Sequence, residues 1–174
     1  MEKLILDNET IKRTLRRIAY EIIEKNSNLN DCVLIGIKQK GIIMAKLLSE
    51  NIQQIEGVNL YTNSIDITPF RDDIETKTSK DINNYINKED ILGKTVILID
   101  DVLYTGRTIR AAMDAIIHIG RPSKIDLAVL VDRGHRQLPI RANYIGKNIP
   151  TSNTETIKVN ITEDYQNSSV MILQ

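Results

Sequence analysis

One segment, residues 96–108, constrains the fold more than any other part of the chain. It opens with four consecutive apolar residues, Val96 to Ile99, which are typical of a strand buried on both faces of a parallel sheet. Asp100 and Asp101 follow directly, so we expect two carboxylates at the carboxyl end of this strand, where open α/β sheets bind their ligands. A helical pattern begins soon afterwards. The segment therefore predicts a strand–turn–helix unit with a ligand site at the turn.

The turn after the two acids has the composition of a phosphate-binding loop. It brings Thr105, Gly106 and Thr108 to the amino end of the expected helix. Free backbone N–H groups and the helix dipole attract an anion at such a position. The unit thus combines two carboxylates, which suit sugar hydroxyls or a metal ion, with a cradle for a phosphate.

Strand and helix patterns alternate along the rest of the chain. Apolar spacing predicts helices at about 11–23, 42–52 and 108–119, and strands at 33–37, 60–67, 96–99, 125–131, 144–146 and 156–161. Alternation of this kind predicts an α/β fold with a mostly parallel sheet and helices on both faces. A length of 174 residues suits one domain with its own core, so we expect a single domain over residues 1–174.

Residues 71–90 interrupt this alternation with a polar stretch. Ten of its twenty residues are charged and few are apolar. Loops of this length inside a compact domain are usually lids, binding elements or disordered segments.

Composition limits the classes of function without choosing one. Lysine plus arginine equal aspartate plus glutamate at 23 each, so any basic surface for a nucleic acid must be local. The single cysteine, Cys32, cannot form an intrachain disulfide, and its apolar neighbours indicate a core position. The first residues lack the apolar core of a signal peptide, and no apolar run approaches the ~20 residues that span a bilayer. We therefore expect a cytoplasmic protein with no membrane partner.

Acidic residues at a strand end have more than one interpretation. They could form a structural ion-pair site, or the phosphorylation site of a receiver domain or phosphohydrolase. The latter two need a Thr or Ser and a Lys at later strand ends, whereas the fourth strand here ends in Val131-Asp132-Arg133-Gly134. Neither explains the Thr-Gly-x-Thr turn. The full spacing of residues 96–108 instead resembles the PRPP-binding signature of type I phosphoribosyltransferases, where PRPP is phosphoribosyl diphosphate.

The resemblance extends over nearly the whole chain. Residues 36–41 resemble the family's pyrophosphate loop, and residues 66–73 resemble the start of its mobile catalytic loop, expected at about 70–90. Residues 131–150 are similar to one branch, the bifunctional pyrimidine operon attenuation regulators that are also uracil phosphoribosyltransferases. This resemblance implies the type I phosphoribosyltransferase fold, a mostly parallel twisted sheet flanked by helices, with a small hood.

The implied reaction is uracil plus PRPP giving UMP plus pyrophosphate. The resemblance assigns catalytic roles to Asp100, Asp101 and Arg71. Mg²⁺ with PRPP is the implied cofactor, and the two aspartates are its ligands either directly or only through water or PRPP. The implied PRPP- and UMP-binding positions are Gln39, Lys40, Gly41, Val102, Leu103, Tyr104, Thr105, Gly106, Arg107, Thr108, Arg133 and Ile157. Of these, Arg133 and Ile157 match base-contacting positions in the family.

Two segments carry local excesses of positive charge. Residues 133–147 hold four fixed positive charges and no acid, and the first expected helix adds Lys12, Arg13, Arg16 and Arg17. Both could simply be solvated faces. The resemblance instead implies that a homodimer, or a hexamer, presents them to a stem-loop of the pyrimidine operon's leader mRNA. The positions carried over as RNA-binding are Arg16, Arg17, Arg136, Arg141 and Lys147.

The resemblance also implies how RNA binding is regulated. UMP or UTP would promote binding to the leader, and binding would favour transcription termination. Tyr20 departs from the family, where this position is often His, although a Tyr can also stack on a base or donate a hydrogen bond. The alternative is a phosphoribosyltransferase for another base, a purine or orotate, with no RNA role.

Overall fold

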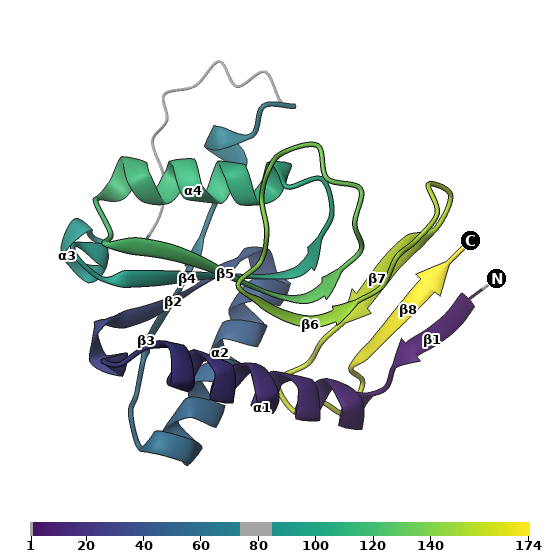
Figure 1. The fold of residues 1–174 in the computed structure, drawn as a ribbon, viewed down its shortest axis with the longest axis horizontal. Helices are drawn as coiled ribbons and strands as arrows, with labels where there is room; N and C mark the ends of the chain where they lie inside the picture. Colours follow the sequence, from purple (N-terminus) through teal and green to yellow (C-terminus); the bar gives the residue numbers. More distant parts are fainter. Residues whose placement is uncertain (1, 74–84) are drawn as a thin grey trace.

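A five-stranded parallel sheet forms the centre of the computed structural model, which describes residues 2–73 and 85–174 (Figure 1). The strand order is β3-β2-β4-β5-β6, and every neighbouring pair is parallel. The strands are β2 (Cys32–Ile37), β3 (Tyr61–Ile65), β4 (Thr95–Leu103), β5 (Lys124–Asp132) and β6 (Tyr144–Asn148). The central position of β4 places the two predicted aspartates in the middle of the sheet's carboxyl edge.

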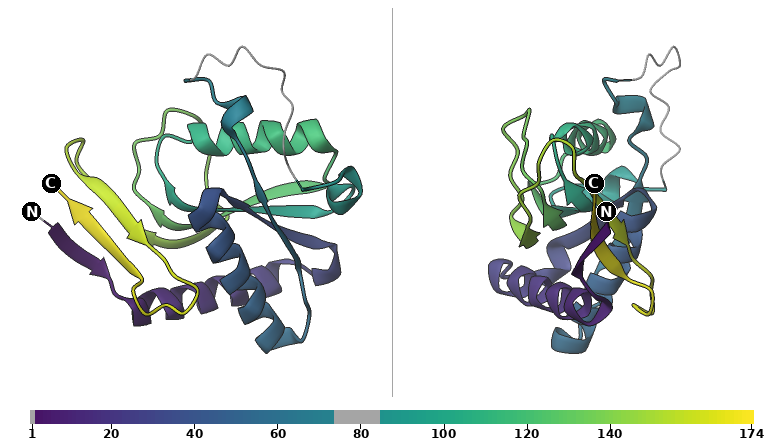
Figure 2. Two further views of the ribbon diagram at one scale, coloured as in Figure 1. Left: turned by 180° about the vertical axis from the view of Figure 1, so that it is seen from behind. Right: turned by 90° about the vertical axis from the view of Figure 1, so that its right-hand side faces the viewer.

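Helices cover both faces of this sheet, as expected (Figures 1 and 2). The long helices are α1 (Asn8–Lys25), α2 (Lys38–Glu56) and α4 (Arg107–Ile119), and the short elements are α3 (Lys88–Ile91) and the 3-10 turns η1 (Leu29–Asp31) and η2 (Thr68–Phe70). Successive residues of β4 alternate between two hydrophobic cores. Ile97 and Ile99 pack in the core of α1 and α2, whereas Val96 and Leu98 pack in the core of α4. The apolar run is therefore buried on both faces.

A second, three-stranded antiparallel sheet stands beside the first and forms the hood. It contains β1 (Glu2–Leu6), β8 (Ser169–Leu173) and β7 (Thr156–Asn160) in that order, so the two chain ends lie side by side (Figure 1). Leu6, Val159 and Val170 from this sheet join the core of α1 and α2. The hood therefore shares its apolar packing with the central sheet.

Several boundaries differ from those expected. Strand β4 continues to Leu103, so both aspartates lie within the last residues of the strand rather than after it. Helix α2 begins at Lys38 instead of residue 42, because Gly36 and Gly41 allow the start of the helix to lie directly on β4. Part of the expected mobile loop, residues 74–84, lies outside the described residues. Cys32 is buried, as expected.

No helix in the described part of the chain is both long and apolar enough to cross a bilayer.

Candidate active site and basic surface

Asp100 and Asp101 differ in environment although they are adjacent in β4. Asp100 is only 5% exposed, whereas Asp101 is partly open to solvent. Burial and the neighbouring negative charge of Asp101 raise the pKa of Asp100 well above its ordinary value. Asp101 instead has a cationic partner, because Lys40 Nζ lies 3.3 Å from its Oδ2 atom. The pair therefore offers one carboxyl that favours a proton and one carboxylate held by a lysine.

Two glycines bring Lys40 to this position at the start of α2. A Cβ atom at Gly36 would lie 2.3 Å from the backbone nitrogen of Ile42, and one at Gly41 would lie 2.5 Å from the carbonyl oxygen of Ile99. Real Cβ atoms do not approach backbone atoms this closely, so both positions require glycine. The close approach lays the first turn of α2 on β4. Lys40 consequently lies exposed beside Asp101, and Gln39 lies exposed in the same first turn of α2.

The turn between β4 and α4 lies where the sequence predicts a phosphate cradle. Gly106 immediately precedes α4 and adopts φ +93°, a left-handed conformation that favours glycine. Thr105 Oγ1 accepts a hydrogen bond from the N–H of Arg107 at 3.3 Å. The first N–H groups of any α-helix lack intrahelical acceptors, so this end of α4 provides backbone donors for an anion.

A pocket of about 300 Å³ opens on the other side of the start of α2. Its polar lining comes from the start of α2, the end of β3 and η2, and includes Lys38, Gln39, Ser64, Thr68 and Arg71. Arg71 donates to Asp73 through Nε at 2.8 Å and also forms an ion pair with that carboxylate. This pairing raises the pKa of Arg71. The pocket carries the cations of Lys38 and Arg71 and has the polar character that a diphosphate requires.

Asp72 was not singled out from the sequence, yet it connects the segment that follows η2 to the start of α4. Its carboxylate lies 2.7 Å from Arg107 Nη1 and 3.6 Å from Arg110 Nη1, both on α4. No periodic or compositional signal distinguishes Asp72 from its acidic neighbours. Only the folded chain shows that residues before the undescribed segment contact the first turn of α4.

Arg133 joins the hood to the phosphate turn. Its side chain is largely buried, and its guanidinium carbon lies 4.0 Å from the ring centre of Tyr104. Nε donates to Thr151 Oγ1 at 3.1 Å, and Nη2 donates to the carbonyl of Glu155 at 2.7 Å. Ile157, the other residue carried over as base-contacting, lies in β7 and is 9% exposed. Arg133 therefore bridges the turn between β4 and α4 and the segment that leads into the hood strand β7.

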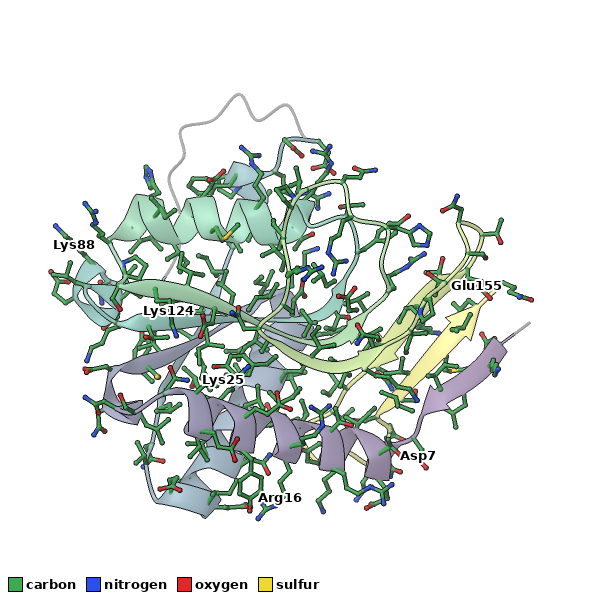
Figure 3. All side chains as sticks on the ribbon, in the orientation of Figure 1. Asp7, Arg16, Lys25, Lys88, Lys124 and Glu155 are labelled. Atoms are coloured by element: carbon green, nitrogen blue, oxygen red, sulfur yellow. The ribbon has the colours of Figure 1, made fainter. Side chains whose placement is uncertain are left out.

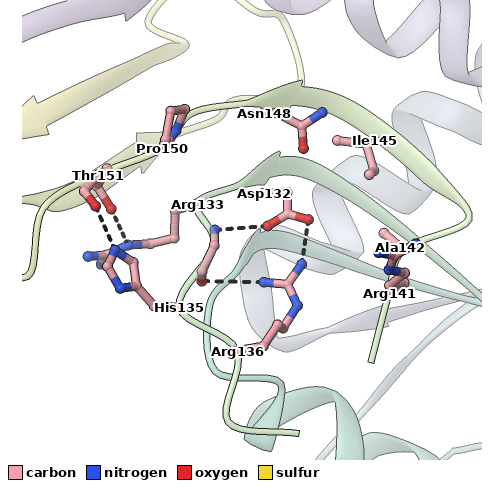
Figure 4. A pocket seen from close by; sticks show the side chains of 11 residues that line it. Asp132, Arg133, His135, Arg136, Arg141, Ala142, Ile145, Asn148, Pro150 and Thr151 are labelled. Carbon is pink, nitrogen blue, oxygen red and sulfur yellow. Dashed lines mark hydrogen bonds and ion pairs between the residues drawn. The ribbon is translucent and has the colours of Figure 1, made fainter. Parts of the chain in front are cut away.

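A larger cavity, of about 860 Å³, lies between the segment after β5 and strand β6 (Figure 4). Arg136 and Arg141, both predicted to bind RNA, line it. Arg136 forms an ion pair with Asp132, whereas Arg141 is exposed and has no hydrogen bond or ion pair with the residues described. The two predicted RNA-binding arginines thus have different surroundings within one cavity.

The remaining predicted RNA-binding residues lie on α1 and β6, which pack against each other. Arg17 donates to the carbonyls of Gly146 at 2.6 Å and Ile145 at 3.1 Å. Arg16 points outward from α1, 5.7 Å from the ring centre of Tyr20 (Figure 3). Lys147 is exposed on β6. The fold therefore brings two basic segments, far apart in the sequence, onto neighbouring elements.

Comparisons with known proteins agree with this architecture. The family model for the phosphoribosyl transferase domain matches residues 2–168. The hypoxanthine phosphoribosyltransferase of Trypanosoma cruzi superposes with a TM-score of 0.72 at 17% identity, covering 99% of this chain and 96% of that one. A hypoxanthine-guanine phosphoribosyltransferase from Bacillus anthracis gives 0.71 at 21% identity, with coverage of 99% and 97%. At these identities the likeness shows the fold alone.

Closer relatives carry the name bifunctional protein PyrR. The Bacillus subtilis protein is 55% identical over 174 residues, covering 98% of this chain and 96% of the relative. The Enterococcus faecalis protein is 53% identical over 171 residues, again covering 98% and 96%. The chain therefore belongs to the phosphoribosyl transferase family and, within it, to the bifunctional PyrR proteins.

Proposed function

We propose that this protein is a UMP-responsive RNA-binding regulator of transcription of a pyrimidine biosynthesis operon, and that it also catalyses the reaction of uracil with PRPP to give UMP and pyrophosphate. The observation that carries the enzymatic part is the convergence of three groups at one sheet edge. These groups are the two aspartates of β4, the glycine turn before α4 and Lys40 from α2. Relatives more than 50% identical, named bifunctional, support the combination of two activities.

In this proposal each end of PRPP binds its own part of the site. The 5′-phosphate binds the backbone donors and hydroxyls of the turn at Thr105 and Thr108, and hydrogen bonds to such a charged group contribute about 1.5–3 kcal/mol each. The ribose hydroxyls face Asp100 and Asp101. The diphosphate extends towards Lys40 and the pocket that Arg71 lines.

The reaction replaces one bond to the ribose anomeric carbon with another. The bond to the diphosphate oxygen breaks and its electron pair leaves with pyrophosphate, the bond to N1 of uracil forms, and the N1 proton passes to solvent. Positive charge develops on the ribose in the transition state, and the carboxylate of Asp101 stabilises it electrostatically. Lys40 and Arg71 stabilise the negative charge of the departing pyrophosphate. Positioning and electrostatics supply most of the rate enhancement in this scheme.

The residues at the site fit a magnesium ion that arrives with its substrate. In residues 2–73 and 85–174, no three His, Cys, Asp or Glu side chains gather as a metal site. Asp100 and Asp101 therefore suit an ion that takes its other ligands from the diphosphate and water, as Mg²⁺ commonly does. When bound, the ion would neutralise charge on the diphosphate.

The RNA-binding part of the proposal depends on the basic residues of α1, β6 and the segment after β5. Arg16, Arg141 and Lys147 are exposed there, with their charges available to phosphates. We place the leader mRNA stem-loop on this surface, with UMP or UTP bound at the PRPP site. A homodimer or hexamer would extend the surface over more than one copy of the chain.

The enzymatic proposal is tested by measuring UMP formation from uracil and PRPP, with hypoxanthine and orotate as competing bases. We expect turnover with uracil and none after the double change Asp100→Asn, Asp101→Asn, in a protein whose circular dichroism is unchanged. Turnover with another base in preference to uracil would favour the alternative, a purine or orotate phosphoribosyltransferase.

The regulatory proposal is tested by titrating a labelled leader stem-loop with and without UMP over a range of salt concentrations. We expect UMP to tighten binding and salt to weaken it, because phosphate contacts release counterions. Binding that ignores both would contradict the regulatory proposal and leave the enzymatic one intact.

A further inference from the structure

The guanidinium of Arg136 is almost fully engaged inside the protein. Nε donates to the carbonyl of Ile140 at 2.8 Å, and Nη1 donates to the carbonyls of Tyr104 at 2.9 Å and Gly134 at 3.4 Å. Nη2 donates to the carboxylate of Asp132 (Figure 4). An arginine has five N–H groups, and four of them have acceptors here. A phosphate could bind only the one remaining N–H of Arg136 unless it displaced these partners.

The partners of Arg136 come from two places that the proposed function must connect. Tyr104 belongs to the turn that holds the 5′-phosphate, and its neighbour Thr105 accepts from the N–H groups of Gln137 at 3.0 Å and Leu138 at 3.3 Å. Ile140 lies immediately before Arg141, the exposed arginine of the large cavity. Arg136 thus connects the nucleotide-binding turn directly to the backbone that carries a predicted RNA-binding residue.

We propose that Arg136 is a positioning residue that couples the occupancy of the nucleotide site to RNA binding, and that it does not itself bind an RNA phosphate. This inference rests on the proposed function. A nucleotide phosphate bound at the turn holds the carbonyls of Tyr104 and Thr105 in place. Arg136 transmits that order to the carbonyl of Ile140, which sets the position of Arg141 on the RNA-facing side.

The two roles predict different changes when Arg136 is replaced. Loss of a phosphate contact lowers the slope of log affinity against log salt by about 0.7–0.9 and weakens binding equally with and without UMP. Loss of coupling leaves the salt slope unchanged and lowers the ratio of the two affinities. Such ratios are about 5- to 150-fold in allosteric proteins, so a fall towards one is readily measured.

The test is fluorescence anisotropy of a labelled pyrimidine-operon leader stem-loop, with and without saturating UMP, over a salt series. We expect Arg136→Gln to reduce the UMP effect to about twofold or less with the wild-type salt slope. Arg141→Gln should lower both the slope and the UMP effect, because in this scheme the coupling reaches the RNA through Arg141. Arg121→Gln, the same change at an exposed arginine outside the cavity, is the matched control and should match wild type in both.

A second variant keeps the test decisive if Arg136→Gln lowers the melting temperature of the protein too far for the RNA titration. Asp132→Asn removes the ionic partner of Arg136 and leaves every predicted RNA-binding cation in place. Because it deletes a negative charge from the cavity, a phosphate-contact role for Arg136 predicts tighter RNA binding with the full UMP effect. The coupling role predicts a reduced UMP effect.

The failure of the inference and the failure of the proposed function give different results. A wild-type protein whose RNA binding ignores UMP contradicts the proposed regulatory function itself. A wild-type protein that responds to UMP, together with an Arg136→Gln variant that loses salt slope and keeps the response, overturns only the coupling role.

Discussion

Gly41 provides a sensitive test of how the sheet edge positions Lys40 and Asp101, which we propose act in catalysis. In Gly41→Ala the new methyl carbon would lie 2.5 Å from the carbonyl oxygen of Ile99, and ordinary contacts begin at 3.4 Å. The first turn of α2 must therefore move away from β4 by about 0.9 Å, because the Cβ atom and the carbonyl oxygen are both fixed by the backbone and no side chain can rotate to relieve the contact. Such overpacking typically costs about 1–3 kcal/mol of folding free energy.

The same movement would separate Lys40 from Asp101, which are now 3.3 Å apart. A displacement of about 1 Å in a positioned group can lower an enzyme's rate by about a hundredfold. We therefore expect kcat/KM for PRPP to fall by about a hundredfold, measured as initial rates of UMP formation at several PRPP concentrations.

Gly57→Ala is the matched control at the opposite end of α2. Gly57 has φ +72° and open space around its Cβ position, so alanine there adds backbone strain of about 1–2 kcal/mol without any collision. We expect lower stability in urea and unchanged kcat/KM. The reasoning would be refuted if both variants lost similar stability and Gly41→Ala kept its kcat/KM within threefold of wild type.

Three further predictions concern charges and rings at the site. Because the pKa of Asp100 is raised in the folded protein, ionisation of this carboxyl destabilises the fold as pH rises from 3.8 through the raised value. Asp100→Asn should therefore increase the melting temperature at pH 8 and leave it nearly unchanged at pH 3. An equal increase at both pH values would contradict this prediction. Asp72→Asn frees Arg107 from an exposed ion pair, so KM for PRPP should fall while the free energy of unfolding changes by less than about 1 kcal/mol. A raised KM would count against a role of Arg107 in binding PRPP. Tyr104→Ala removes the ring beside Arg133, which should raise KM for uracil more than KM for PRPP in steady-state assays; the opposite order would place Arg133 away from the base.

The parts of the site that could be predicted from the sequence are those made of contiguous residues. The apolar run, the two aspartates and the glycine turn are one strand–turn–helix unit, so local patterns were enough to put Asp100 and Asp101 at the carboxyl end of the strand and Gly106 just before the helix, although the strand continues past the aspartates to Leu103. The fold class followed from the same alternation of strands and helices, and the parallel sheet confirms it.

Features that depend on distant partners could not be predicted in this way. Strands β1 and β8 are short, lie at the chain ends and pair only with each other and with β7, so no local pattern marks them as a sheet. The contacts of Asp72 with α4 and of Arg136 with Tyr104 likewise join residues about thirty positions apart. Charge counting treated Arg136 and Arg141 alike, and only the folded chain distinguishes them. The assignment of individual site residues and of a single domain remains a prediction.

The pairing of β1 with β8 has a consequence for the order of synthesis. Strand β8 is the middle strand of the hood and comes after all the other strands described, whereas the five parallel strands are complete by Asn148. On the ribosome, the sheet edge that carries Asp100 and Asp101 can therefore form before the hood exists, and the first residues of the chain must wait unpaired for the final ones. Premature termination before β8 would deprive both β1 and β7 of their partner, leaving a chain whose parallel sheet is assembled but whose hood is not.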